Sequence, residues 1–233
     1  MTAKSPVISL VDVDNTLLDN DHVAADLRRH LERQVGHERQ ERYWAIFEEL
    51  RADLGYADYL GALQRYRVEH PRDPHLLTVS AFLVDYPFAN RLYPGSLDVL
   101  EHLRAWGPAV IYSDGDAVFQ PRKIERSGLR EAVDGNVLVY IHKERELQDV
   151  EERYPADHYV LVDDKLRILT SVKQAWRRRV TTVFPRQGHY ARDPTTLAEY
   201  APADLSIERI GDLVEYDLSA LLAAAGPGTG QCR

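Results

Sequence analysis

Four apolar runs of the chain each end in side chains that could take part in phosphoryl transfer. These side chains are carboxylates, a hydroxyl and an ammonium group: Asp12 and Asp14, Ser113, Lys143, and the pair Asp163-Asp164. If the apolar runs are parallel strands, their carboxyl ends meet at one edge of a sheet, which is where α/β proteins bind ligands. We therefore expect these residues to lie together in one site.

The types of these side chains favour chemistry on a phosphate ester. Clustered carboxylates repel one another, so a divalent cation between them is the simplest reason for their grouping. Oxygen ligands without His or Cys favour a hard ion, and we expect Mg²⁺ rather than Zn²⁺. One carboxylate can attack phosphorus and a second can protonate the leaving oxygen. Ser113 and Lys143 can hold the remaining phosphate oxygens.

The elements that must position these residues alternate between strand and helix patterns. Five short runs rich in Val, Ile and Tyr are predicted as strands: Val7–Val13, Ala109–Tyr112, Asn136–Ile141, Tyr159–Val162 and Val180–Phe184. Helical patterns lie before and between the last four: Ser96–Trp106, Val118–Arg130, Arg145–Arg153 and Leu166–Arg178. This alternation predicts an α/β fold, with a Rossmann-like parallel sheet in a three-layer α/β/α arrangement.

One long segment departs from this alternation. Residues 19–90 show helical periodicity, are dense in aromatic side chains and contain no convincing strand. We predict an α/β core domain of residues 1–18 and 91–219, and an all-helical cap of residues 19–90 inserted after the first strand. Residues 220–233 are predicted to be a flexible tail. Its glycines, Gly226, Gly228 and Gly230, follow no strand and are not interpreted as a dinucleotide-binding loop.

The order and spacing of the motifs resemble those of the haloacid dehalogenase-like hydrolases. Asp12-Val13-Asp14-Asn15-Thr16 is similar to the first motif of that family, an apolar strand followed by D-x-D-x-T. Ser113 resembles the second motif, Lys143 the lysine of the third, and Asp163-Asp164 the acidic fourth. The resemblance extends over nearly the whole chain, and the helical insertion stands where this family carries its C1 cap.

The resemblance implies a role for each matching residue. Asp12 would be the nucleophile and a metal ligand. Asp14 would be the general acid/base and would offer its backbone carbonyl to the metal. Ser113 and Lys143 would bind the transferring phosphoryl group.

The loop after Ser113 and the fourth motif would complete the site. Asp114 and Gly115 would help to bind phosphate through backbone amides or loop shape. Asp163 and Asp164 would hold Mg²⁺ with the first motif, and Asp164 is preferred as the direct ligand. Ile168 stands where the family commonly has a further acid, which leaves the outer metal shell open.

The resemblance also implies a choice of reaction. Members that cleave carbon–halogen bonds lack an acid at the position of Asp14, because a leaving halide needs no proton. We expect Mg²⁺-dependent hydrolysis of a small phosphomonoester through an aspartyl-phosphate on Asp12, with the cap closing over the substrate. Two alternatives stay open: a sugar phosphomutase of the same family, and a catalytically quiet binding or regulatory protein.

Other polar residues are predicted to have ordinary structural positions. Lys123 is expected on the helix after Ser113, Lys165 is expected to face solvent, and Gly188-His189-Tyr190 is interpreted as a plain loop. In the cap, four residues could touch substrate, with no basis for choosing among them: His22, Arg42, Tyr43 and Arg91.

Composition limits the partners. The chain has 233 residues and a net charge of −8, which argues against a general nucleic-acid binder. No apolar run approaches the roughly 20 residues that span a bilayer, and the short polar start Met1–Pro6 does not resemble a signal peptide. We expect a cytoplasmic enzyme that acts on a small phosphorylated metabolite, as a monomer or homodimer, with neither nucleic acid nor membrane as partner.

Overall fold

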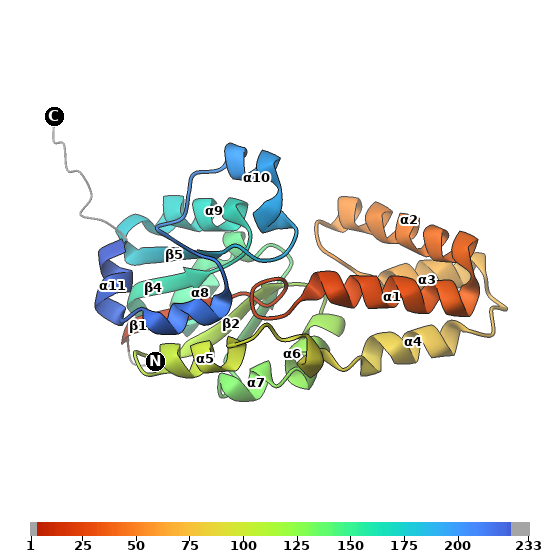
Figure 1. Cartoon of the computed structure of the whole chain (residues 1–233), viewed down its shortest axis with the longest axis horizontal. Coiled ribbons are helices and arrows are strands. Elements are labelled where there is room, and N and C mark those ends of the chain that lie inside the picture. Colours follow the sequence, from red (N-terminus) through yellow and green to blue (C-terminus); the bar gives the residue numbers. More distant parts are fainter. Residues whose placement is uncertain (1–3, 225–233) are drawn as a thin grey trace.

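The computed structural model describes residues 4–224, and a six-stranded parallel sheet lies at its centre (Figure 1). The strand order is β3-β2-β1-β4-β5-β6. The strands are β1 (Ser5–Val11), β2 (Ala109–Asp114), β3 (Val137–Tyr140), β4 (Ala156–Val162), β5 (Val180–Pro185) and β6 (Leu205–Ile207). The predicted α/β fold with a parallel sheet is confirmed. Because β1 pairs with both β2 and β4, its carboxyl end is flanked by theirs.

The sheet has one strand more than the five predicted. β6 contains three residues and pairs with β5, with Leu205 opposite Val183. Three residues are too few to show an alternating pattern, so this strand is defined by its pairing with β5 rather than by its own sequence.

Helices cover both faces of the sheet, as the three-layer prediction requires. The core helices are α5 (Ser96–Arg104), α6 (Phe119–Arg126), α7 (Leu129–Ala132), α8 (Leu147–Arg153), α9 (Leu166–Trp176), α10 (Pro194–Glu199) and α11 (Leu218–Ala224). Successive side chains of β1 point to opposite faces: Val7 and Val11 join the apolar cluster that contains α5, and Ile8 and Leu10 join the cluster that contains α9. Figure 1 shows α5 and α9 on opposite sides of the sheet.

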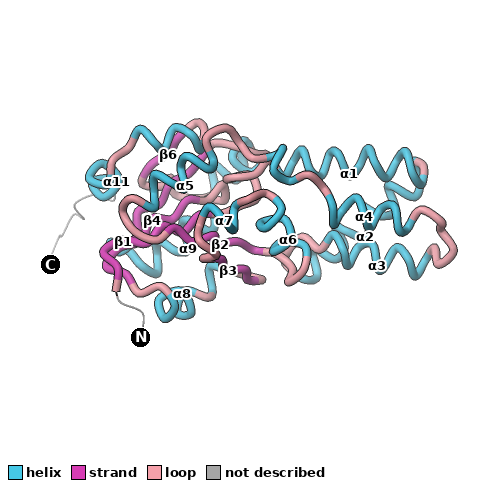
Figure 2. The backbone as a smooth tube through the Cα atoms, turned by 90° about the horizontal axis from the view of Figure 1, so that it is seen from below, coloured by secondary structure: helices cyan, strands magenta, loops and turns pink. Residues whose placement is uncertain are grey.

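Four helices extend away from the end of the sheet where β1 stops (Figure 2). They are α1 (Asn20–Val35), α2 (His37–Leu54), α3 (Tyr59–Glu69) and α4 (Leu76–Asp85), and we call them the cap. Gly36, with φ of 83°, turns the chain between α1 and α2. The aromatic residues of the cap form one continuous cluster with a face of the core, since the ring of Tyr59 lies 5.1 Å from that of Phe119 on α6.

The end of the chain differs from the predicted tail. Residues 220–224 belong to α11, and Leu221 is fully buried. The tail prediction is therefore corrected for these residues, because an apolar side chain ties the helix to the core. Residues 225–233, with the three tail glycines, lie outside the described part of the chain. No helix within residues 4–224 is both long and apolar enough to cross a bilayer.

Candidate active site

The pairing of β1 places Asp12 at the edge of the sheet. Val11 is the last residue of β1 and pairs with Ile111 and with Val162. Asp12 follows directly, and its amide donates a hydrogen bond of 3.0 Å to the carbonyl of Val162. Asp163 continues β4 beside it, so the strand register alone brings the first and fourth motifs together.

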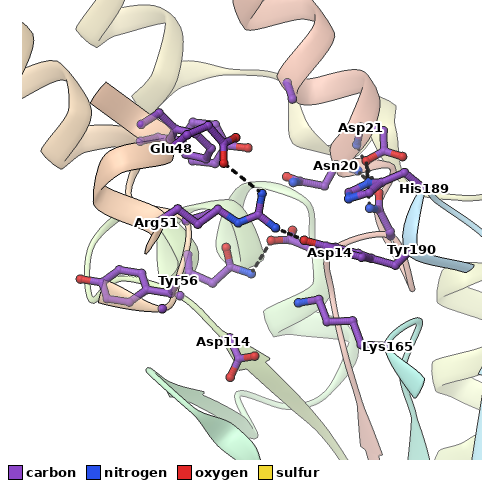
Figure 3. Close-up of a pocket in the computed structure, with 18 of the residues that line it drawn as sticks. Asp14, Asn20, Asp21, Glu48, Arg51, Tyr56, Asp114, Lys165, His189 and Tyr190 are labelled. Carbon is purple, nitrogen blue, oxygen red and sulfur yellow. Dashed lines mark hydrogen bonds and ion pairs between the residues drawn. The ribbon is translucent and has the colours of Figure 1, made fainter. Parts of the chain in front are cut away.

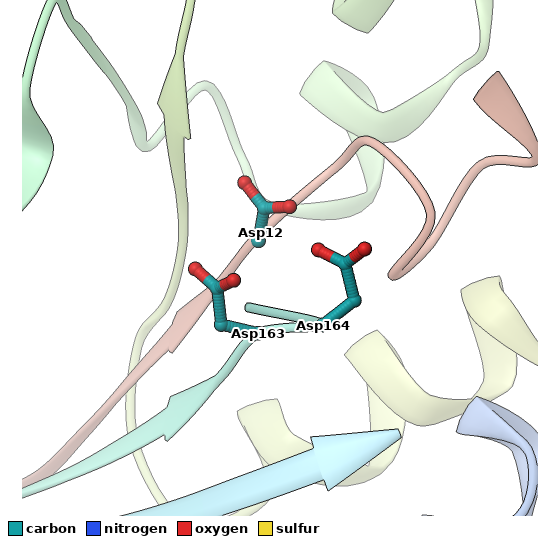
Figure 4. Close-up of side chains that lie close together, drawn as sticks. All are labelled: Asp12, Asp163 and Asp164. Carbon is teal, nitrogen blue, oxygen red and sulfur yellow. The ribbon is translucent and has the colours of Figure 1, made fainter. Parts of the chain in front are cut away.

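Three carboxylates converge at this edge (Figure 4). Asp12, Asp163 and Asp164 are at most 2% exposed, and one carboxylate oxygen from each lies within 4.8 Å of the others. One oxygen of Asp12 and both oxygens of Asp164 have no hydrogen-bond partner. Burial raises the pKa of Asp163 to about 6 and raises that of Asp164 as well. Buried acids with unpartnered oxygens fit a site for a hard cation.

Lys143 is the buried counterion of two of these acids. Its ammonium lies 2.5 Å from Oδ1 of Asp12 and 2.7 Å from Oδ2 of Asp163, and the side chain is fully buried. Burial favours a lower pKa for Lys143, but the carboxylates of Asp12 and Asp163 outweigh it and raise the pKa. Three carboxylates and one ammonium leave a formal charge of −3 + 1 = −2, which a divalent cation would balance.

The loop after β1 is shaped by the remaining polar residues of the first motif. Asn15 has φ of 61°, a left-handed conformation that Asn tolerates better than most residues. Its side-chain oxygen accepts the amides of Asn20 and Asp21 at the start of α1. The hydroxyl of Thr16 accepts the amide of Asp164 at 3.0 Å, so the first motif also positions the fourth.

Asp14 stands apart from the three buried acids and faces the cap. Its carboxylate lines a pocket and accepts a hydrogen bond of 2.6 Å from Lys123, which also contacts Asn20 at 3.0 Å. Lys123 is 1% exposed. Its burial was not predicted from the sequence, although Lys123 shares the buried face of α6 with Phe119 and Ile124.

Ser113, at the end of β2, is linked to Asp14 by a residue that the motifs do not include. The side-chain amide of Gln120 donates to the hydroxyl of Ser113 at 2.9 Å and to Asp14 at 3.5 Å. Gln120 is buried on α6, and its type and spacing carry no signal in the sequence. It holds the two predicted site residues in one hydrogen-bonded group.

Asp114 and Gly115 shape the neighbouring loop. The carboxylate of Asp114 accepts the amide of Lys143 at 2.8 Å and so fixes the turn that carries the lysine. The amide of Gly115 donates to the carbonyl of Tyr140 and is occupied. A Cβ at Gly115 would lie 2.6 Å from Cβ of Gln120, so glycine allows this close packing. The amide of Gly115 is therefore used by the fold, and the help of Gly115 in phosphate binding through the shape of the loop stays a prediction.

A pocket of about 560 Å³ lies between this edge of the sheet and the cap (Figure 3). Asp14, Asp114 and Lys123 line its floor. Lys165 and the His189-Tyr190 pair also line it, which corrects the expectation of a solvent-facing lysine and a plain loop. Burial would lower the pKa of Lys165, but the carboxylates of the site, Asp12 foremost, raise it.

The cap contributes to the pocket an arginine that the sequence did not single out and several of its aromatic residues. Arg51, Tyr56, Trp44 and Phe47 line the pocket. The four earlier candidates lie elsewhere among the described residues: His22, Arg42, Tyr43 and Arg91. They have structural contacts instead; the buried Tyr43, for example, donates to the carbonyl of Tyr59 at 2.9 Å.

Comparisons with known proteins agree with this architecture. The family model described as haloacid dehalogenase-like hydrolase matches residues 9–175. The structure superposes with a TM-score of 0.88 on a haloacid dehalogenase-like hydrolase from Burkholderia xenovorans, at 65% identity over 91% of this chain and 99% of the other. A search of curated proteins finds no match. The chain belongs to the haloacid dehalogenase-like hydrolases.

More distant solved structures share the fold. A haloacid dehalogenase-like family hydrolase from Xanthomonas campestris has a TM-score of 0.67 at 16% identity, over 97% of this chain and 95% of the other. The L-2-haloacid dehalogenase from Xanthobacter autotrophicus has a TM-score of 0.57 at 21% identity, over 89% and 96%. At these identities the likeness concerns the fold alone.

Proposed function

We propose that this hydrolase releases phosphate from a small phosphomonoester, with Asp12 as the nucleophile and Mg²⁺ as its cofactor. The observation that carries the proposal is the buried group Asp12, Asp163 and Asp164, whose unpartnered oxygens and net negative charge call for a divalent cation. A dianionic phosphate could not approach such a group without one.

Asp12, Asp163 and Asp164 fit a hard cation because they offer only oxygen and exclude water from most of their surface. Mg²⁺ held there would supply positive charge to the phosphate oxygens. The backbone carbonyl of Asp14 is proposed as a further ligand, by resemblance to the family.

The protein's own groups account for the transfer. Asp12 attacks phosphorus and carries the phosphoryl group as an aspartyl-phosphate. Lys143, already 2.5 Å from Asp12, lowers the repulsion between nucleophile and phosphate. The hydroxyl of Ser113 lies at the end of the neighbouring strand and is proposed to bind a phosphate oxygen.

Asp14 is proposed to move the protons. Its carboxyl group lines the pocket, where in its protonated form it would give its proton to the departing alkoxide and then, as the carboxylate, take one from the attacking water. Lys123 and Gln120 fix its orientation. A leaving halide would need no such proton, so the placement of Asp14 supports phosphate ester hydrolysis over dehalogenation.

A phosphate-release assay with Mg²⁺ on a panel of phosphate esters tests the proposal. Steady release of inorganic phosphate is the expected result. Isomerised sugar phosphate without phosphate release would indicate a phosphomutase, and no turnover on any ester would favour a quiet binding protein. Inclusion of L-2-chloropropionate tests for halide release, which we expect to be absent.

A further inference from the structure

One side of the pocket carries positive charge that the proposed transfer does not use. Arg51 reaches it from α2 of the cap, and Lys165 reaches it from the loop before α9 (Figure 3). Both cations lie beside the ring of Tyr190: the guanidinium carbon is 5.9 Å and the ammonium 5.6 Å from its centroid. Arg51 also donates a hydrogen bond to the hydroxyl of Tyr190.

These two cations have spare donors. A guanidinium has five N–H groups, and Arg51 directs its polar contacts to Tyr190 and to the exposed Glu48, at 3.6 Å, within the described residues. The ammonium of Lys165 makes no hydrogen bond or ion pair with any residue of 4–224. Most of the hydrogen-bonding capacity on this side therefore faces the open pocket.

Among the acids of the lining, Glu48 offsets part of the charge of Arg51 at 3.6 Å, whereas two others are held by different partners. Asp14 is held by Lys123, and Asp21 is held by His189 at 2.7 Å and by Asn15. The donors of Arg51 and Lys165 that no described residue accepts are thus the part of the lining to which an anion would bind.

Aromatic rings of the cap and of α6 form another part of the pocket lining. Trp44 and Phe47 lie 5.2 Å apart, Phe47 and Tyr59 4.7 Å, and Tyr59 and Phe119 5.1 Å, measured between ring centroids. All four line the pocket. The carbon skeleton of a bound alcohol would pack against these rings, with its charged end toward Arg51 and Lys165.

We propose that Arg51, Lys165 and Tyr190 form a subsite for a second anionic group, carried on the alcohol part of the substrate. This inference rests on the proposed function for the phosphate end of the ester. Because Arg51 belongs to the cap and the other two belong to the core, one bound anion contacts both. Recognition of the substrate is thereby coupled to a closed pocket.

A set of matched esters tests the subsite. 4-Carboxyphenyl phosphate carries the anion, and 4-carbamoylphenyl phosphate is its neutral counterpart of equal size. We expect kcat/KM to favour the carboxylate by about 10- to 100-fold, the scale of hydrogen bonds to a charged group. 4-Phosphonophenyl phosphate distinguishes a phosphate-type anion from a carboxylate, and preference for either anion supports the subsite. Equal kcat/KM for all three esters overturns it.

Substitutions of Arg51 test whether this residue causes the preference for the anionic ester. Arg51→Gln should bring the two kcat/KM values together, mainly through KM, because a binding contact is lost. Arg51→Lys should retain part of the preference, since it retains the charge. Arg42→Gln is the matched control: it lies on the same helix, pairs with Glu69 and Glu49 outside the pocket, and should leave the ratio unchanged. A preference that survives in Arg51→Gln overturns the assignment.

Binding of the free alcohols separates this inference from the proposed function. Calorimetry with 4-hydroxybenzoate and 4-hydroxybenzamide requires no turnover. Absence of hydrolysis on every ester contradicts the proposed function alone. Tighter binding of the benzoate, lost in Arg51→Gln, supports the subsite in either case, and equal binding of the two alcohols contradicts it.

Discussion

The two regions that face each other across the pocket hold their polar side chains in different ways. At the sheet edge, Asp12 and Lys143 are at most 2% exposed and contact each other directly. In the cap, Arg51 has a side chain that is 39% exposed and reaches across open space to Tyr190. The core fixes a compact charged group, whereas the cap presents groups that a ligand can still reorganise.

The difference follows from what holds each group. Backbone hydrogen bonds fix the core residues: the amide of Asp12 binds a β4 carbonyl, and the amide of Asp164 binds Thr16. The guanidinium of Arg51, at the end of a long side chain, is held by contacts with other side chains alone. We infer that the core determines which bond is broken and the cap determines which molecule is chosen. The five predictions that follow test this division, from the largest expected effect to the smallest.

Asp12→Asn should abolish turnover while leaving the fold intact. Loss of a nucleophile lowers kcat on the scale of about 10⁶-fold. The buried site also loses a repelling charge, so the melting temperature should not fall. A phosphate-release assay measures kcat, and thermal unfolding measures the melting temperature. Substantial residual turnover would contradict Asp12 as the nucleophile.

Asp14→Asn should lower kcat by about 10²- to 10⁴-fold on an alkyl phosphate, because the leaving alkoxide loses its proton donor. The loss should be much smaller on 4-nitrophenyl phosphate, whose leaving group needs no proton. Equal losses on both esters would contradict an acid role.

The buried Lys123 requires a control in this experiment, since Asp14→Asn removes its charged partner. The double variant Asp14→Asn with Lys123→Met removes both charges. It should recover stability relative to the single variant without recovering activity on the alkyl phosphate.

Mg²⁺ should stabilise the folded protein. At 100 times its dissociation constant, a ligand of the native state adds about 2.7 kcal/mol. For a chain of this size that corresponds to a rise of roughly 5–10 °C in melting temperature. Asp164→Asn should lose this response, whereas Asp157→Asn, on the surface, should keep it. An unchanged response in Asp164→Asn would place the metal elsewhere.

The stabilisation by Mg²⁺ should increase as the pH rises. Burial raises the pKa of Asp163 to about 6 in the folded, metal-free protein, above its unfolded value. Ionisation therefore costs metal-free stability as pH rises from about 4 through 6. Below pH 6 a proton competes with Mg²⁺, so stabilisation by the metal should grow from pH 5 to pH 7. A constant Mg²⁺ effect over this range would contradict the carboxylate site.

Asp58→Ala should affect the cap alone. Asp58 caps α3 by accepting the amide of Gly61 at 2.7 Å, and loss of such a cap costs about 1 kcal/mol. The melting temperature should fall by roughly 2–4 °C. The kcat for 4-carbamoylphenyl phosphate, which has no second anionic group, should stay unchanged. Asp53→Ala, on an exposed face of α2, is the matched control. A large loss of kcat would show that the cap takes part in the chemistry itself.

Much of the core could be predicted from the sequence because its signals are local. Val7–Val13 is an apolar run of strand length, and β1 occupies most of it. Parallel strands have their carboxyl ends at one edge, so Asp12 and Asp163 are brought together by topology alone. β6 was not predicted because three residues are too few to show an alternating hydrophobic pattern. These residues form a strand only because they pair with the edge of β5.

The cap side of the pocket could not be predicted in the same way. Helical periodicity predicted that residues 19–90 are helical, but it does not show which exposed position of a helix faces a neighbouring element. Arg42 and Arg51 are both arginines on α2, nine positions apart, and only the packing of the cap on the core directs one of them into the pocket.

The sequence by itself determined the acids of the motifs, Lys143 and their common position at the carboxyl edge of the sheet. The reason is that the hydrophobic patterns of the strands and the spacing of the motifs are local features of the chain. Only the tertiary structure decided that Lys123 is buried against Asp14 and that Lys165 and Tyr190 meet Arg51. A lysine is normally exposed, and its burial depends on a partner that lies more than 100 positions away in the chain for Lys123. Such contacts exist only after the chain has folded.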